Sequence, residues 1–223
     1  MVLPKILGDR ELLIRYGDKD LCLITFYADF DRDSLQEIFD AVPRITIVAI
    51  GIKDWNAELS PWKAPPVFGD ENFGDGAADT LSFIQEELIP EMGCKEYALG
   101  GYSLAGLFSL WACYESGSFR GCAAASPSVW FPGWDEYIRE RRINSDFVYL
   151  SLGDKESRTR NQYMSKVSDR IQMQYDALYG AMGDDVVLEW NQGNHFKNPT
   201  DRKIKAFRWV VDALSPYRMR QGC

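Results

Sequence analysis

Residues 99–106 have the sequence Leu-Gly-Gly-Tyr-Ser-Leu-Ala-Gly and lie between two apolar segments. This pattern predicts a strand that ends in a glycine turn, with Ser103 at its apex and a helix beginning at Leu104. A serine in so sharp a turn needs small residues two positions before and after it, and these are Gly101 and Ala105. The stretch therefore indicates a nucleophile elbow, with an ordinary strand–turn–helix as the alternative.

Short apolar runs rich in valine, isoleucine and aromatic residues alternate with stretches of helical period along the chain. We expect strands at residues 21–28, 46–52, 95–99, 121–125, 147–152 and 186–190. We expect helices at residues 34–42, 77–91, 104–114, 134–142, 160–179 and 201–214. The alternation predicts an α/β fold in which helices cover both faces of a mostly parallel sheet, as a single domain over residues 1–223.

Three local signals add detail to this assignment. Ser34 and Glu37 have the spacing of a capping box, which predicts that the Ser34 side chain caps the following helix. Pro90 is expected to close the helix at residues 77–91. Residues 60–76, rich in proline and tryptophan, are expected to form a loop over the edge of the sheet that carries the site.

Composition and charge exclude several classes of protein. The 223 residues are 46% hydrophobic and 26% charged, as in ordinary globular proteins, and the net charge is −8. No basic stripe offsets this charge, so we do not expect nucleic acid as a partner. Arg139, Arg141 and Arg142 are interpreted as a solvated helix face, with an anion site as the alternative. No apolar run approaches the ~20 residues that cross a bilayer, and residues 1–10 do not resemble a signal peptide, so we expect a cytoplasmic protein.

The cysteines do not have the pattern of a disulfide framework or a metal site. No two of them form a CxxC pair, and most lie inside apolar segments, which predicts buried, reduced thiols. They are Cys22, Cys94, Cys113, Cys122 and Cys223. Because one histidine and scattered cysteines do not have the spacing of zinc ligands, no metal is expected.

His195, the only histidine, is the candidate base. It lies in Gly193-Asn194-His195-Phe196, between the last predicted strand and the last predicted helix. Loops at the carboxyl ends of parallel strands are where open α/β sheets place their active groups. Imidazole titrates near neutral pH and is suited to accept a hydroxyl proton and return it. Downstream of the Ser103 turn, this position favours a catalytic base over a structural histidine.

A triad on this type of scaffold follows the chain order serine, acid, histidine. The acid is therefore expected after the strand at residues 147–152, where Asp154 and Glu156 lie. We favour Glu156, because acids here commonly lie three residues after the glycine that ends the strand, and Asp154 is the alternative. Asp184 and Asp185 precede the last strand and so belong to the opposite end of the sheet.

These motifs together resemble those of an esterase family of α/β-hydrolases that includes esterase D and the enterochelin esterases. The resemblance covers nearly the whole chain and rests on residues 54–62, 83–90, 101–106, 126–130, 153–156 and 193–196. It implies an α/β-hydrolase fold with Ser103 as nucleophile, Glu156 as acid and His195 as base. It says little about the substrate.

Two main-chain N–H groups are expected to stabilise an oxyanion. The first is that of Leu104, at the start of the helix behind Ser103. Many relatives carry His-Gly after the first central strand, where this chain has Phe26-Tyr27-Ala28-Asp29. We expect the second donor to be the N–H of Tyr27 or Ala28, with Asp29 an unfavourable neighbour if its carboxylate points inward.

Aromatic residues follow several strands. Trp55 and Trp130 are predicted to bind substrate at the mouth of the site, with a small core made by the loops themselves as the alternative. Glu58 is interpreted as tying down its own loop, with a contact to substrate as the alternative. The expected function is hydrolysis of a small-molecule ester without a metal or organic cofactor. Acyl transfer and a non-catalytic binding role are the alternatives, and a homodimer is common for such domains.

Overall fold

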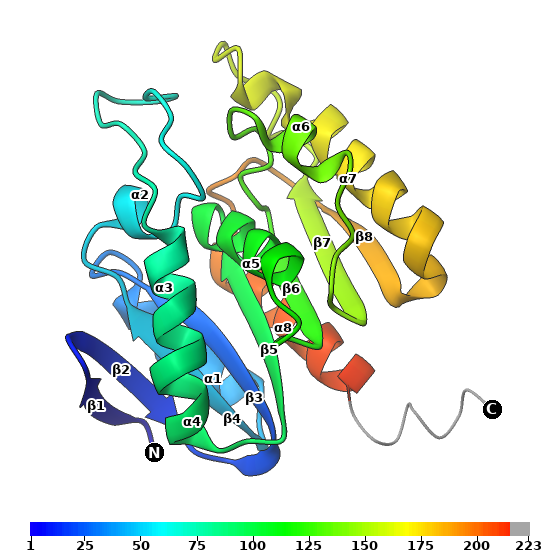
Figure 1. Cartoon of the computed structure of the whole chain (residues 1–223). Coiled ribbons are helices and arrows are strands. Elements are labelled where there is room, and N and C mark those ends of the chain that lie inside the picture. Colours follow the sequence, from blue (N-terminus) through cyan, green and yellow to red (C-terminus); the bar gives the residue numbers. More distant parts are fainter. Residues whose placement is uncertain (215–223) are drawn as a thin grey trace.

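The strands of the computed structural model, which describes residues 1–214, form one eight-stranded sheet in the order β1-β2-β4-β3-β5-β6-β7-β8 (Figure 1). The pairs β1–β2 and β2–β4 are antiparallel. All other neighbouring strands, from β4 through β3 to β8, pair in parallel. The strands are β1 (Leu3–Leu7), β2 (Arg10–Arg15), β3 (Asp18–Tyr27), β4 (Ile45–Gly51), β5 (Glu96–Tyr102), β6 (Gly121–Ala125), β7 (Phe147–Gly153) and β8 (Val186–Asn191). The prediction of a mostly parallel sheet is confirmed.

The hairpin of β1 and β2 was missed by the sequence-based assignment, which began the sheet at residue 21. A two-residue Gly8-Asp9 turn joins the two strands, and Gly8 adopts a φ of +57° that glycine tolerates. Strand β2 buries Leu12 and Ile14 completely and leaves the residues between and beside them partly exposed. Such alternation is typical of an antiparallel strand with one covered face.

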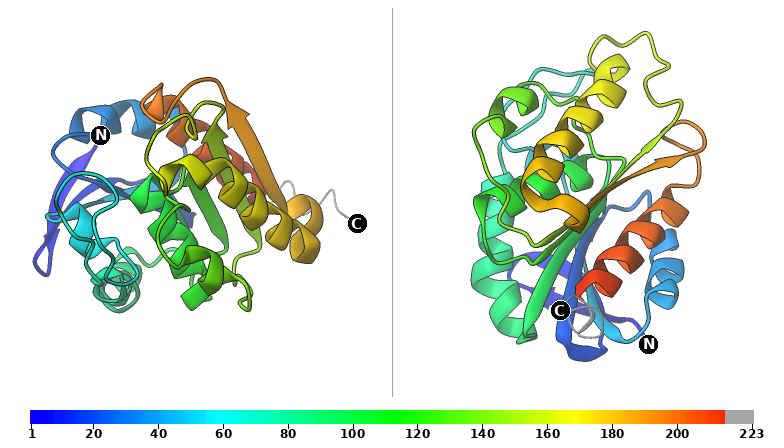
Figure 2. Two further views of the ribbon diagram at one scale, coloured as in Figure 1. Left: turned by 90° about the horizontal axis from the view of Figure 1, so that it is seen from above. Right: turned by 90° about the vertical axis from the view of Figure 1, so that its right-hand side faces the viewer.

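Helices cover both faces of the sheet, as predicted (Figure 2). Helices α3, α5 and α7 lie over one face, and α1 and α8 lie over the other. The helices are α1 (Leu35–Ala41), α2 (Trp55–Glu58), α3 (Ala77–Phe83), α4 (Ile89–Met92), α5 (Leu104–Glu115), α6 (Trp134–Ile138), α7 (Val167–Met182) and α8 (Pro199–Leu214). Helix α5 is buried along almost its whole length against β5 and β6, because it lies between the sheet and the outer loops.

Several predicted helix boundaries were wrong. The helix expected at 134–142 ends at Ile138, and the one expected from residue 160 begins as α7 at Val167. Pro90 does not close the helix at 77–91, which continues to Met92. A π-helical turn at Ile84–Leu88 lies between α3 and α4, and Pro90 is the second residue of α4.

The capping box predicted at Ser34 is also absent from the described structure. Ser34 makes no side-chain cap, and its Oγ instead donates to the carbonyl oxygen of Asp31 at 2.7 Å. Ser34 already has helical backbone angles, because it ends a 3-10 turn at Arg32–Ser34. A residue inside such a turn does not have the extended backbone that a capping residue needs.

The cysteines and the hydropathy of the helices can be compared with the expectations above. The four cysteines within residues 1–214 are free thiols, and all but the half-buried Cys94 are buried. Cys223 lies outside the described residues. Over the same range, none of the helices combines the length and the apolar character that a membrane crossing requires.

Candidate active site

Ser103 occupies a strained turn between β5 and α5. Its backbone has φ +59° and ψ −121°, values that residues other than glycine rarely adopt. Strand β5 runs through both glycines to Tyr102, so Ser103 itself makes the turn that the sequence pattern had assigned to the glycines. The Ser103 N–H donates to the Ala125 carbonyl at 3.2 Å, and the Ser103 carbonyl accepts from Leu107 at 3.0 Å. These bonds hold the turn in place.

The small residues around Ser103 are required by the close approach of β5 and α5. A Cβ atom on Gly101 would lie 2.5 Å from the carbonyl carbon of Ala105 and 2.7 Å from its Cβ. Real Cβ atoms do not approach backbone so closely, and neither partner is a flexible side chain. The elbow therefore excludes any side chain at position 101.

Gly101→Ala is expected to lower the free energy of unfolding by about 2–3 kcal/mol, because overpacking at a rigid backbone contact displaces the strand or the helix. Urea denaturation followed by circular dichroism measures this loss. Gly117→Ala is the matched control, since a Cβ there meets nothing within 4 Å, and its effect should stay within about 0.5 kcal/mol. Equal losses in the two variants would show that the approach of β5 and α5 does not constrain position 101.

Three side chains that follow three different strands meet at the carboxyl edge of the sheet. Ser103 follows β5, Glu156 follows β7 and His195 follows β8. His195 Nε2 lies 3.1 Å from Ser103 Oγ, and His195 Nδ1 lies 2.7 Å from Glu156 Oε2. The Oγ atom of Ser128 lies 3.3 Å from Ser103 Oγ on the other side. The structure thus brings together the serine, the histidine and one of the two acids that the sequence singled out.

The Glu156 carboxylate is buried but well hydrogen-bonded. Burial raises the pKa of Glu156, but the hydrogen bond and charge of His195 and the hydrogen bonds from Gly153 and Ser126 lower it. The pKa of Glu156 consequently lies below its ordinary value, and the group is ionised near neutral pH. The Gly153 N–H donates to Oε1 at 2.7 Å, Ser126 Oγ donates to the same atom at 2.9 Å, and Arg202 Nη1 at 2.7 Å.

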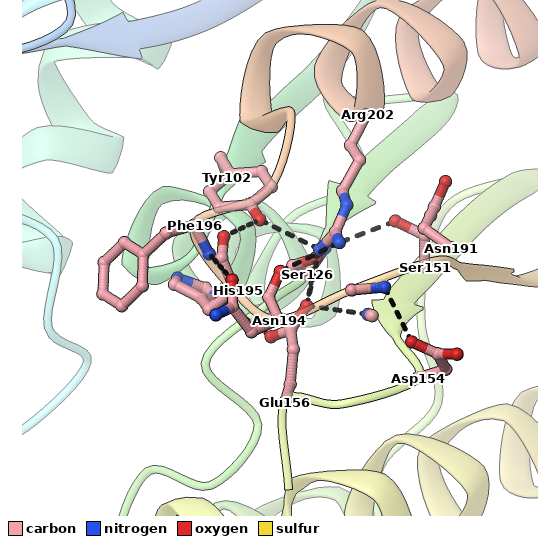
Figure 3. Close-up of polar contacts among 12 residues, drawn as sticks. Tyr102, Ser126, Ser151, Asp154, Glu156, Asn191, Asn194, His195, Phe196 and Arg202 are labelled. Atoms are coloured by element: carbon pink, nitrogen blue, oxygen red, sulfur yellow. Dashed lines mark hydrogen bonds and ion pairs between the residues drawn. The ribbon is translucent and has the colours of Figure 1, made fainter. Parts of the chain in front are cut away.

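Asp154, the alternative acid, has a different position. Its Oδ1 atom accepts a hydrogen bond from the Gly193 N–H at 2.7 Å, in the loop that carries His195 (Figure 3). Its own N–H donates to the Asn191 carbonyl at 2.8 Å. Asp154 is exposed and ties the loop after β7 to the loop after β8 without touching the imidazole. Of the two acids, the structure brings only Glu156 to His195.

In the loop after β3, one of the two N–H groups predicted as a second oxyanion donor is already hydrogen-bonded. The Ala28 N–H donates at 3.0 Å to Oδ1 of Asp31, and Oδ2 of Asp31 pairs with Lys203 at 3.0 Å. The Tyr27 carbonyl accepts from Ile52 at 2.8 Å within the sheet. Asp29 is exposed, so the carboxylate that lies against this loop is that of Asp31. Leu104 is the first residue of α5, and its N–H precedes the hydrogen-bonded turns of that helix.

A cavity of about 530 Å³ lies beside Ser103 and His195. Aromatic residues make up much of its lining, namely Phe26, Phe30, Trp55, Tyr102 and Phe196. Phe30 and Phe196 are largely exposed at its mouth, and the rings of Phe30 and Trp55 meet edge to face at 5.4 Å. Trp55 therefore lines the cavity beside Ser103, which is the location expected for it from the sequence.

Trp130, the other predicted substrate contact, does not line this cavity. It is buried among the outer loops, where its ring lies 5.8 Å from that of Phe68 and 6.1 Å from that of Phe73. Its surroundings fit the alternative of a small core made by the loops. Glu58 has the position expected of a loop-tying residue, because its carboxylate accepts from the Lys53 and Asp54 N–H groups.

Comparison with known proteins rests on solved structures. The chain matches no protein-family model and no curated protein sequence. An IroE-like serine hydrolase from Shewanella oneidensis matches with a TM-score of 0.72 and 16% identity, over 96% of this chain and 81% of that one. The enterobactin esterase from Shigella flexneri matches with a TM-score of 0.70 and 14% identity, over 96% of this chain and 60% of the esterase. This chain has the α/β-hydrolase fold.

The α/β-hydrolase neighbours agree with the esterase family that the sequence resembles. The IroE-like serine hydrolase and the enterobactin esterase belong to the types of protein that the resemblance implied. The capsule O-acetyltransferase of Neisseria meningitidis serogroup A also shares the fold, with a TM-score of 0.58 and 11% identity over 94% of this chain and 93% of that one. The fold is thus common to proteins that hydrolyse esters and to one that transfers acetyl groups.

Several residues of this α/β-hydrolase site were not singled out from the sequence. Arg202 and Lys203 are adjacent residues near the start of α8, and both are almost completely buried. Arg202 contacts Glu156, and Lys203 contacts Asp31. One signal pointed to them: with Ala206, Phe207 and later apolar residues they continue the buried stripe of α8 at helical spacing. Charged residues at apolar positions of a helix are unusual unless they are paired.

Proposed function

We propose that this chain is a serine-dependent carboxylic-ester hydrolase that acts through an acyl-enzyme. The observation that carries the proposal is the continuous chain of hydrogen bonds from Ser103 Oγ through His195 to Glu156, with distances of 3.1 and 2.7 Å. A nucleophile, a base within hydrogen-bond reach and an acid that orients the base are the three parts such a reaction needs. Ser103 is the nucleophile, His195 the general base and Glu156 the acid.

The ionised Glu156 sets the state of the imidazole. Its Oε2 atom accepts the proton on Nδ1 of His195, so that Nε2 is left as the acceptor that faces Ser103. Nε2 takes the hydroxyl proton as Oγ bonds to the ester carbonyl carbon. The resulting imidazolium is stabilised by the adjacent carboxylate, and it returns the proton to the leaving alcohol. Water, activated by the same nitrogen, then hydrolyses the acyl-enzyme and frees Ser103.

The developing oxyanion is held by main-chain donors in this proposal. The N–H of Leu104 is the first donor, at the N-terminus of α5. The second comes from Tyr27 or Ala28, as expected from the sequence, and Ala28 can serve only when its N–H leaves the Asp31 carboxylate. The substrate is a small-molecule ester whose apolar part lies in the cavity beside Trp55. No metal or organic cofactor takes part in any of these steps.

A fluorophosphonate probe is expected to attach to Ser103 of the wild-type protein and to no other serine, because only an activated hydroxyl displaces fluoride from such a probe. Intact-protein and peptide mass spectrometry locates the adduct, and a panel of short p-nitrophenyl esters measures turnover. Ser128→Ala is the matched control, since it removes a buried hydroxyl 3.3 Å from Ser103 Oγ and should leave the adduct on Ser103.

The outcomes separate the proposal from its alternatives. If the folded wild type is unlabelled and hydrolyses no ester of the panel, the chain is a binding protein with a hydrolase fold. If Ser103 is labelled and an added alcohol is acylated faster than water, the chain is an acyltransferase. The latter candidate is supported by the O-acetyltransferase that shares the fold.

A further inference from the structure

Arg202 is a buried cation at the centre of the polar network around His195 (Figure 3). It lies in the first turn of α8, and its side chain is only 2% exposed. The guanidinium enters the network from α8, which packs on the face of the sheet opposite α5. A buried arginine is stable only if its donors are paired, so its partners indicate what it holds.

The two ends of the guanidinium contact the two loops that carry the acid and the base. Nη1 donates to Glu156 Oε1 at 2.7 Å, to Ser126 Oγ at 3.1 Å and to the Tyr102 hydroxyl at 3.2 Å. Nη2 donates to the carbonyl oxygen of Asn194 at 2.9 Å, next to His195 in the chain. One rigid, planar group therefore fixes the position of the loop after β7 relative to the loop after β8.

The contacts divide the Glu156 carboxylate between two partners. Arg202 binds Oε1, and His195 Nδ1 binds Oε2. The Tyr102 hydroxyl also donates to the His195 carbonyl at 2.5 Å, which ties the backbone of the base to the same cluster. Because Oε1 is already taken by Arg202 and two other donors, Oε2 stays directed at the imidazole. The positive charge of Arg202 offsets the cost of burying the carboxylate without competing for that atom.

We infer that Arg202 is the positioning residue of this site: it aims the Glu156 carboxylate at His195 and holds the base loop at hydrogen-bond distance from Ser103. This inference rests on the proposed function. It assigns to Arg202 no contact with substrate, so its loss should act on the rate of reaction at Ser103 rather than on the binding of ester.

Arg202→Met is expected to lower kcat for p-nitrophenyl ester hydrolysis and the rate of fluorophosphonate labelling about 10²-fold, with KM changed less than about threefold, because a small misplacement of the base is costly. Arg202→Lys should be about tenfold faster than Arg202→Met in both rates, since lysine keeps the positive charge but lacks the planar group with two donor ends. Lys205→Met is the matched control. Lys205 is on the same helix and forms an exposed ion pair with Glu189, so its loss should leave both rates unchanged.

A double variant separates positioning from a general effect on folding. On the Glu156→Gln background the carboxylate is gone and only the hold on the base loop is left to lose. Adding Arg202→Met should therefore lower kcat by clearly less than the 10²-fold expected in the wild type, and the double variant should unfold at a higher temperature than Glu156→Gln alone. The inference is overturned if the kcat losses of the two single substitutions multiply in the double variant. It is also overturned if a folded Arg202→Met reacts at the wild-type rates. If Arg202→Met does not fold, the positioning role of Arg202 is tested with Arg202→Lys and the double variant instead. An unlabelled wild type would instead overturn the proposed function.

Discussion

Replacement of His195 by alanine is expected to lower kcat of ester hydrolysis by about 10⁴ or more and to change KM little. The imidazole Nε2 atom lies 3.1 Å from Ser103 Oγ, and no other histidine exists in the chain to take the proton. Because triad residues act as one unit, Ser103→Ala should cause a similar loss and the double variant no greater one. Steady-state kinetics on a p-nitrophenyl ester compare the four proteins.

The single histidine also provides a control for this prediction. Diethyl pyrocarbonate modifies imidazole, so inactivation of the wild type should follow the modification of one residue, His195. Imidazole added to His195→Ala should restore part of the activity, since it can occupy the space that the side chain leaves and accept the same proton. Activity that survives in His195→Ala, or inactivation that precedes modification, would show that another group is the base.

The sequence was sufficient for those parts of the fold that depend on local pattern. The turn at Ser103 was found because a strand, two glycines and a helix follow one another without interruption, and small residues flank the serine. The same holds for the loop of His195, which lies between β8 and α8. The hairpin of β1 and β2 was missed although its Gly8-Asp9 turn is a hairpin signal, because neither strand alternates apolar and polar residues. The first, Leu-Pro-Lys-Ile-Leu, is interrupted by Pro4, and the second, Arg-Glu-Leu-Leu-Ile-Arg, groups its apolar residues together.

The contacts that cross the sheet could not be predicted in this way. Lys203 and Asp31 are 172 positions apart, yet they pair at the carboxyl edge because α8 packs beside the loop after β3. Pairing of a buried charge depends on which loop faces it, and neither periodicity nor composition contains that information. Trp130 shows the same limit: it follows β6, as a substrate contact would, but its ring turns into the core of the outer loops.

The choice between Asp154 and Glu156 depended on the turn that follows β7. Both carboxylates come within three residues of Gly153, so distance along the chain did not separate them. The N–H of Glu156 donates to the Gly153 carbonyl at 3.1 Å, which closes a turn and directs the Glu156 side chain back toward β7. Asp154 is the second residue of that turn, and its side chain reaches the Gly193 N–H instead. Turn geometry of this kind is set by the loops on either side.

Glu156→Gln is expected to lower kcat by about 10³–10⁴, because an amide at this position no longer stabilises the imidazolium and favours the wrong tautomer of His195. The amide also leaves Arg202 without its carboxylate, and the variant should therefore be less stable by about 3–5 kcal/mol. Kinetics are to be measured on protein whose circular dichroism confirms folding. The Glu156→Asp variant retains the charge on a shorter side chain and should lose less activity than Glu156→Gln.

Asp154→Asn is the matched control that decides between the two acids. The Oδ1 atom of asparagine can still accept the Gly193 N–H that Asp154 binds at 2.7 Å, so kcat should stay within a few-fold of wild type. A large loss in Asp154→Asn with near-normal activity in Glu156→Gln would make Asp154 the acid, and would require the loop after β7 to rearrange when substrate binds. Equal large losses would mean that holding the base loop in place matters as much as the charge beside the imidazole.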